Sequence, residues 1–124
     1  MSSILVIEDV LPVLVSLKIV LQGAGHEVAT APNGVAGLEL LKGADFDLVV
    51  TDIWMRGSSG TDVIREGRKL APRTRFLAIT GGDPNVSGQG SLLRPDNYGA
   101  DALMLKPFEK EQLLSLVSRL LDRA

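Results

Sequence analysis

Short apolar runs alternate along the chain with longer segments that repeat their hydrophobic positions at helical spacing. Runs of this length, rich in branched side chains, are typical of strands buried on both faces of a parallel sheet. The sequence predicts four such strands, at residues 4–7, 45–51, 75–80 and 102–105. A weaker run at residues 26–30 predicts a fifth strand at an edge.

Helical segments with clear start and stop signals lie between these strands. Pro12 falls in the first turn of one segment, and Asn33 is a suitable N-cap for the next. Gly25 and Pro72 follow two segments and prevent their continuation. The predicted helices cover residues 11–24, 34–42, 60–70 and 109–122. This alternation predicts one doubly wound α/β domain: a five-stranded parallel sheet with right-handed crossovers and with helices on both faces.

One interval departs from the alternation. Residues 81–90 contain four glycines and one proline, and a candidate helix at residues 91–98 is interrupted by Pro95. We therefore expect a tolerant connecting segment of elevated mobility, followed by a short or irregular helix.

The amino-acid composition excludes several kinds of catalytic and metal site. The 124 residues contain no cysteine, which excludes disulfides, zinc–thiolate sites, iron–sulfur clusters and cysteine nucleophiles. His26 is the lone histidine, so a multi-histidine metal site is excluded and a serine–histidine–aspartate triad is disfavoured. The net charge of −2 predicts no strong non-specific attraction to nucleic acid, and no stretch is apolar enough to span a membrane.

Polar residues stand at the predicted carboxyl ends of the strands, where open parallel sheets bind their ligands. They are Glu8 and Asp9 after the first strand, Asp52 and Thr80 at the ends of the third and fourth, and Lys106 after the fifth. Two carboxylates about 4 Å apart repel by about 1 kcal/mol in water and by about 4 kcal/mol at an effective dielectric constant of about 20. Lys106 supplies one compensating charge, and a hard divalent cation, above all Mg²⁺, suits the remainder. A carboxylate beside Mg²⁺ and a lysine can accept a phosphoryl group, giving an aspartyl-phosphate.

These residues occur in an order that one protein family shares. The matching segments are residues 4–9, residues 48–52, Gly60, residues 79–80, residues 99–101 and residues 106–108. Each segment alone is a weak signal, but together and in order they form a specific pattern. The sequence resembles a response-regulator receiver domain of two-component signalling over essentially its whole length. The resemblance implies a flavodoxin-like fold with the strand order 2-1-3-4-5.

The resemblance implies a role for each acidic residue. Asp52 would be the phosphoacceptor, taking the phosphoryl group from a phosphohistidine on a histidine kinase or phosphotransfer protein. Asp9, Asp52 and the backbone carbonyl of Trp54 would bind Mg²⁺ directly, and Glu8 would act through water. With these roles, the domain would promote its own phosphorylation and would not be a turnover enzyme.

The remaining strand-end residues would contact the phosphoryl oxygens. The resemblance assigns this role to Thr80 and Lys106, and it implies a cis peptide between Lys106 and Pro107. Each residue also has a plainer interpretation, since Asp9 could cap the first helix, Thr80 could simply favour a strand and Lys106 could be a solvated charge. Their joint occurrence favours the site.

The sequence departs from the family pattern at two positions. Leu103 stands where the family usually has a tyrosine or phenylalanine, so the aromatic part of the usual conformational switch is missing. Arg56 stands where a proline is usual, and the glycine and serines that follow predict a more flexible loop.

Two surface features suggest partners. Leu11, Val15 and Ile19 form a second apolar row on the first helix, at positions where polar residues normally face water. These are either scattered surface hydrophobes or a contact with a kinase helix or a second receiver, and the resemblance places kinase docking on this helix. A basic cluster on and after the third predicted helix is accompanied by Asp62 and Glu66, which favours a solvated face over an anion-binding one. The cluster consists of Arg65, Arg68, Lys69, Arg73 and Arg75.

The predicted function is a phosphoacceptor receiver, filling residues 1–124, that changes its interaction surface on phosphorylation. By resemblance the protein would be cytoplasmic, with a possible downstream protein target and no direct contact with nucleic acid or membrane. The chain is expected to be a stand-alone regulator, with a piece cut from a longer protein as the alternative. A degenerate receiver acting as a constitutive protein-interaction module is the main functional alternative. A flavin- or nucleotide-binding domain would have a glycine-rich phosphate loop after the first strand, and a haloacid-dehalogenase-like phosphatase would have its nucleophile there.

Overall fold

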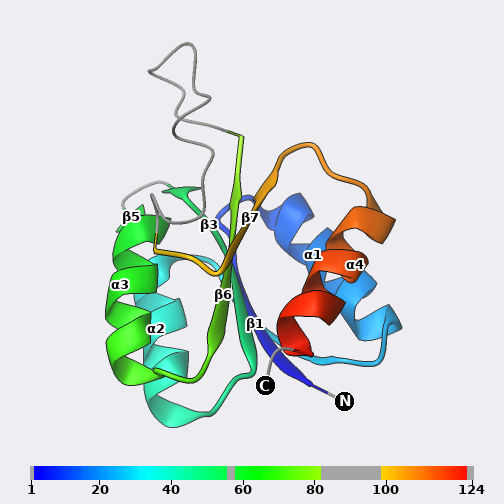
Figure 1. Cartoon of the computed structure of the whole chain (residues 1–124). Coiled ribbons are helices and arrows are strands. Elements are labelled where there is room, and N and C mark those ends of the chain that lie inside the picture. The colour runs from blue at the N-terminus through cyan, green and yellow to red at the C-terminus, as the bar shows by residue number, and fades with distance from the viewer. Residues whose placement is uncertain (1, 56–57, 82–98, 123–124) are drawn as a thin grey trace.

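Five parallel strands form the central sheet, in the order β2-β1-β3-β6-β7 (Figure 1). The computed structural model describes residues 2–55, 58–81 and 99–122. The strands are β1 Ser3–Ile7, β2 Glu27–Ala31, β3 Leu48–Asp52, β6 Arg75–Thr80 and β7 Ala102–Leu105. The helices are α1 Leu11–Gly23, α2 Gly34–Gly43, α3 Gly60–Leu70 and α4 Lys110–Leu121. Counted within this sheet alone, the order is the predicted 2-1-3-4-5, which confirms the flavodoxin-like fold.

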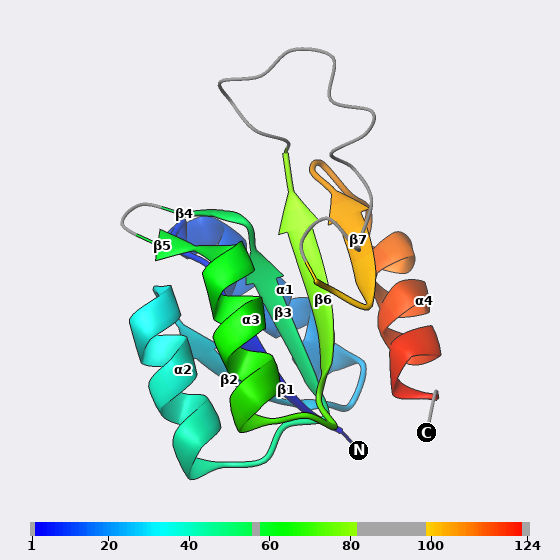
Figure 2. The ribbon, with the colours of Figure 1, turned by 60° about the vertical axis from the view of Figure 1, so that its left-hand side comes forward.

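Helices cover both faces of the sheet, with α1 and α4 on one side and α2 and α3 on the other (Figures 1 and 2). Strand β1 shows why four consecutive residues, 4–7, are all apolar. Ile4 and Val6 join the core cluster on the α1 and α4 side, whereas Leu5 and Ile7 join the cluster beneath α2 and α3. Because successive side chains of a strand point to opposite faces, both sets must be apolar.

Local signals at the helix ends are largely confirmed. The Asn33 side chain accepts a hydrogen bond of 2.8 Å from the backbone N–H of Ala36, as an N-cap does. Gly25, just beyond α1, has a φ of +96°, a conformation that glycine adopts at little cost. The N-cap position of α1 is Val10, so the alternative in which Asp9 occupies that cap is wrong.

A small hairpin between β3 and α3 was not predicted. Its strands, β4 Trp54–Met55 and β5 Ser58–Ser59, are antiparallel and pair Trp54 with Ser59. Two-residue strands are too short to leave a periodic pattern in the sequence, so no hydrophobic signal announces them. The hairpin places Trp54 two residues beyond the end of β3.

Some predictions concern residues outside the described part of the chain. The expected mobility of residues 81–90, except at Gly81, and the irregular helix at residues 91–98 belong to this group, as does the replacement at Arg56. None of the helices in the described ranges combines the length and apolarity needed to cross a membrane.

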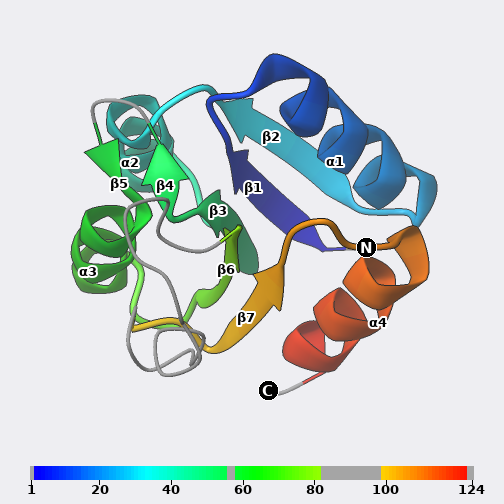
Figure 3. The same ribbon diagram turned by 90° about the horizontal axis from the view of Figure 1, so that it is seen from above.

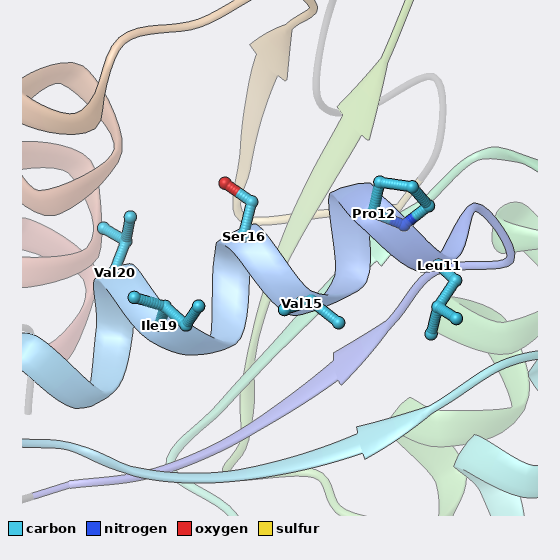
Figure 4. Close-up of a pocket in the computed structure, with 6 residues that line it drawn as sticks. All are labelled: Leu11, Pro12, Val15, Ser16, Ile19 and Val20. Atoms are coloured by element: carbon cyan, nitrogen blue, oxygen red, sulfur yellow. The ribbon is translucent and has the colours of Figure 1, made fainter.

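The second apolar row of α1 faces outward, as predicted. Leu14, Leu17 and Leu21 are buried in the core. Leu11 and Ile19, by contrast, are 66 % and 62 % exposed, and Val15 is also exposed. Figure 4 shows this row beside a shallow apolar pocket that Pro12, Ser16 and Val20 help to line.

Candidate functional site

Three carboxylates meet at the carboxyl end of the sheet, the end that faces the viewer in Figure 3. Glu8 and Asp9 follow β1, and Asp52 is the last residue of the neighbouring strand β3. A carboxylate oxygen from each lies within 4.8 Å of one from each of the others. Parallel pairing of β1 with β3 therefore brings together the acidic residues that the strand-end pattern predicted.

Lys106 holds two of these carboxylates at once. Its Nζ lies 2.9 Å from Glu8 Oε1 and 2.9 Å from Asp52 Oδ2. The predicted cis peptide between Lys106 and Pro107 is present, and the Lys106 backbone N–H donates to the Thr80 carbonyl at 2.9 Å. The interpretation of Lys106 as a solvated charge is therefore wrong.

Burial of these charged groups shifts their pKa values. Glu8 is 1 % exposed and Asp52 is 5 % exposed, so their charges have little access to water. Burial raises the pKa of Glu8 above its ordinary value of 4.5, and the Asp52 charge adds to this, although the Lys106 hydrogen bond opposes it. Burial alone would lower the pKa of Lys106, but its hydrogen bonds to Asp52 and Glu8 outweigh that effect and raise it above 10.5. Lys106 therefore stays charged throughout the neutral range.

The raised pKa of Glu8 predicts a pH dependence of stability. Such a carboxyl group binds its proton more tightly in the folded chain than in the unfolded chain. Its stabilising contribution is therefore complete below pH 4.5 and is lost as pH rises through the pKa of the folded state. We expect the free energy of unfolding of the metal-free chain, relative to that of Glu8→Gln, to fall as pH rises above 4.5. Denaturant unfolding in EDTA at a series of pH values measures this difference.

Glu66→Gln is the control for that measurement. The hydrogen bond from Lys69 lowers the pKa of Glu66, so its contribution is present above 4.5 and is lost as pH falls through the folded pKa. The difference between Glu66→Gln and the parent should therefore be small, because the pair is exposed, and its pH trend should be opposite to that of Glu8→Gln. The same trend in both would show that Glu8 does not cause the effect.

The backbone around Asp52 is held by contacts that sequence reasoning did not assign. The Thr51 hydroxyl donates to the Asp52 carbonyl at 3.0 Å, and the Trp54 N–H donates to Asp52 Oδ1 at 3.3 Å. A Cβ atom at Gly60 would overlap that same Asp52 carbonyl and lie 2.7 Å from the Cα of Ile53. Gly60 belonged to the family pattern in the sequence, and the structure supplies the reason, which is the close approach of the start of α3 to the end of β3.

The two remaining predicted site residues lie beside this cluster in different settings. Thr80 ends β6, the strand that pairs with β3, and it is fully buried. The side chain of Trp54 is 40 % exposed, although its backbone contacts Asp52. Leu103 lies on β7, partly buried against the core beneath α2 and α3.

The three members of the basic cluster that lie on α3 are of two kinds. Arg65 and Lys69 are exposed and pair with Asp62 and Glu66 on their own helix, which agrees with a solvated face. Arg68 instead reaches away from α3 to the segment that precedes β7. Sequence spacing alone does not distinguish Arg68 from its neighbours.

Comparison with known proteins assigns the family. A profile described as the response regulator receiver domain matches residues 4–118. The chain belongs to this family. Its receiver fold is also that of a CheY-like receiver domain protein from Methanospirillum hungatei, with 30 % identity, a TM-score of 0.86, and coverage of 98 % of this chain and 94 % of the other.

Other relatives carry the same domain in different settings. The receiver matches TrrA from Thermotoga maritima, solved in complex with Mg²⁺ and BeF, with 33 % identity and a TM-score of 0.82 over 97 % of this chain and 99 % of the other. It also matches the cell cycle response regulator CtrA of Brucella ovis with 29 % identity over 98 % of this chain and 50 % of that protein. The chain therefore spans about half the length of the curated relatives it matches.

Proposed function

We propose that Asp52 is the phosphoacceptor of this receiver and that it takes its phosphoryl group from a phosphohistidine. The observation that carries this proposal is the shared ammonium group: Lys106 contacts both Glu8 and Asp52, and Asp9 completes the acidic cluster. A degenerate receiver, used only as a constitutive binding module, has no need for three converging carboxylates. Their mutual repulsion costs stability that a working site recovers on binding cations.

The proposed transfer uses groups already in position. An oxygen lone pair of the Asp52 carboxylate forms the new O–P bond while the N–P bond of the phosphohistidine breaks. The leaving imidazole nitrogen keeps the electron pair of the broken bond and takes up a proton. Lys106, held 2.9 Å from Asp52 Oδ2, is placed to neutralise charge on the transferred group, and Thr80 at the end of β6 would offer its hydroxyl.

The cluster also fits the Mg²⁺ that the sequence predicted. The carboxylates of Asp9 and Asp52 would bind it directly together with the Trp54 carbonyl, and Glu8 would act through water. Hard oxygen donors are the ligands that Mg²⁺ prefers. One carboxylate oxygen from each of Glu8, Asp9 and Asp52 already lies within 4.8 Å of the other two. When bound, the ion supplies electrostatic stabilisation of charge on the phosphoryl oxygens.

Incubation with acetyl phosphate and Mg²⁺ tests the proposal. Intact mass spectrometry should show one added phosphoryl group, and EDTA should prevent the addition. A chain that gains no phosphoryl group with Mg²⁺ present would be the degenerate receiver.

The outward row on α1 predicts where the phosphodonor protein docks. Introducing glutamate at Val15 and Ile19 should weaken phosphotransfer from a cognate histidine kinase by roughly tenfold or more, because a charge opposes burial of this apolar row. Phosphorylation by acetyl phosphate should stay unchanged, since the acidic cluster is not altered. Val35→Glu on α2 is the control, because Val35 is 72 % exposed and lies on the other side of the sheet. Equal loss with both donors would instead indicate misfolding.

We propose that the domain spans residues 1–124 and works as an intracellular signalling module in the cytoplasm. The match to the family over residues 4–118 supports this extent. A histidine kinase or phosphotransfer protein is the expected donor, and a protein target or a second receiver would recognise the changed surface. The domain itself would assist its own phosphorylation rather than turn over a substrate.

A further inference from the structure

Arg68, in the C-terminal half of α3, contacts both strand β6 and the segment that precedes strand β7. Its Nε donates to the Gly99 carbonyl at 2.7 Å, and its Nη2 lies 3.1 Å from Asp101 Oδ2. The same carboxylate oxygen accepts a 2.8 Å hydrogen bond from the Phe76 backbone N–H. The guanidinium also lies over the Phe76 ring, 5.2 Å from its centre. A single side chain thus contacts the start of β6 and the segment that leads into β7.

The segment that Arg68 holds has a specific backbone shape. Gly99 has a φ of +73°, which favours glycine, and the Asp101 N–H donates to the Phe76 carbonyl at 2.9 Å. Strand β7 lies at the edge of the sheet and pairs with β6 alone. Its entry is therefore held by hydrogen bonds to β6 and by the contacts of Arg68 from α3.

The opposite end of α3 touches the phosphoacceptor strand. Gly60 approaches the Asp52 carbonyl so closely that a Cβ atom there would overlap it, and the Gly60 N–H donates to the Ile53 carbonyl at 2.8 Å. At its far half α3 also packs closely, since a Cβ at Gly67 would lie 2.9 Å from the Phe76 ring. Helix α3 is thus anchored at the end of β3 and, through Arg68, at the start of β7.

We propose that the Arg68 clamp, defined as the contacts of Arg68 with Gly99, Asp101 and Phe76, couples the state of Asp52 to β7. A change at Asp52 shifts the first residues of α3, and the clamp passes that shift to the β7 entry. This route requires no aromatic side chain at position 103, where this chain has leucine. The inference rests on the proposed function, because it concerns the consequence of occupying the Asp52 site.

Beryllofluoride with Mg²⁺ serves as the probe, since it mimics a phosphoryl group on a carboxylate. Two readouts are taken on the full chain: Trp54 fluorescence for loading of the site, and amide chemical shifts of residues 99–102 for the response of the β7 entry. The later residues of β7 are left out because they adjoin Lys106, which contacts Asp52 itself. In Arg68→Gln we expect Trp54 fluorescence to change as in the parent, while the β7 shift changes fall by roughly twofold or more, the scale expected of a lost coupling contact. Arg65→Gln is the matched control, because Arg65 lies on the same helix and pairs with Asp62 and Glu66.

The outcomes separate the clamp from the proposed function. Full β7 shift changes in Arg68→Gln, with normal loading, would overturn the clamp and leave the proposed function intact. Absence of both signals in the parent would overturn the proposed function, and with it the inference. If Arg68→Gln fails to fold, Arg68→Lys carries the test: it keeps the charge but lacks the planar fork that reaches two acceptors, so the β7 response should again be reduced.

Discussion

Asparagine at position 52 is expected to abolish phosphoryl uptake from acetyl phosphate. The substitution preserves the size of the side chain and an oxygen that can accept the Trp54 N–H, but it removes the anionic oxygen needed to attack phosphorus. Asp52 is 5 % exposed and contacts Lys106. We therefore expect the loss of its carboxylate to stop the reaction while the surrounding backbone keeps its conformation. Intact mass after incubation with acetyl phosphate and Mg²⁺ is the measurement.

Asp47→Asn is the matched control for this experiment. Asp47 immediately precedes β3, at the opposite end of the strand from Asp52, and its carboxylate accepts the Ser3 N–H at 2.8 Å. Because that site is remote from the acidic cluster, the variant should take up one phosphoryl group as the parent does. Uptake that persists in Asp52→Asn would place the acceptor on another residue and contradict the proposed function.

Lys106→Met is expected to have the second large effect, on both stability and reaction. Removing the ammonium leaves Glu8 and Asp52 close together with their charges unpaired. Breaking a buried ion pair by removing one partner typically costs about 3–5 kcal/mol, and we expect about 2–3 kcal/mol here because the Lys106 side chain is 27 % exposed. Phosphoryl uptake should slow by about 100-fold or more, the usual consequence of losing one group that stabilises transition-state charge.

The pH dependence of this difference follows from the raised pKa of Lys106. A lysine whose pKa is higher in the folded chain stabilises it fully below 10.5, and this contribution is lost as pH rises through the folded pKa. The parent should therefore exceed Lys106→Met in free energy of unfolding throughout the neutral range, and the two should converge above pH 10.5. Denaturant unfolding of both chains in EDTA gives these values.

A surface lysine provides the comparison. Lys69 pairs with Glu66 across one turn of α3, and the two side chains are 69 % and 45 % exposed. Exposed pairs of this kind contribute little, so Lys69→Met should leave unfolding essentially unchanged. An equal loss in the two variants would mean that the contacts of Lys106 with Glu8 and Asp52 carry no special weight.

Contiguous stretches of the sequence predict the strands of the central sheet and the acidic residues at their ends. The apolar runs of β1 and β3 predict strands buried on both faces, and that burial together with the alternating helices predicts that the strands are parallel. Glu8, Asp9 and Asp52 follow from the same logic, because parallel strands end at one edge of the sheet and carry their last residues there. Periodicity and strand ends are local properties, so one sequence suffices to recognise them.

Other features exist only once the elements have packed. Lys106 bridges Glu8 and Asp52 across 98 and 54 positions of the chain, and that geometry depends on how β7 lies against its neighbours. Arg65 and Arg68 are alike in sequence, yet one pairs within its own helix and the other holds the entry to β7. The chain by itself determined the five strands of the central sheet, their parallel direction and the acidic residues at their ends. The tertiary structure decided which charges meet and which helix face is tied to the sheet, because such contacts depend on distances between elements that are remote in sequence.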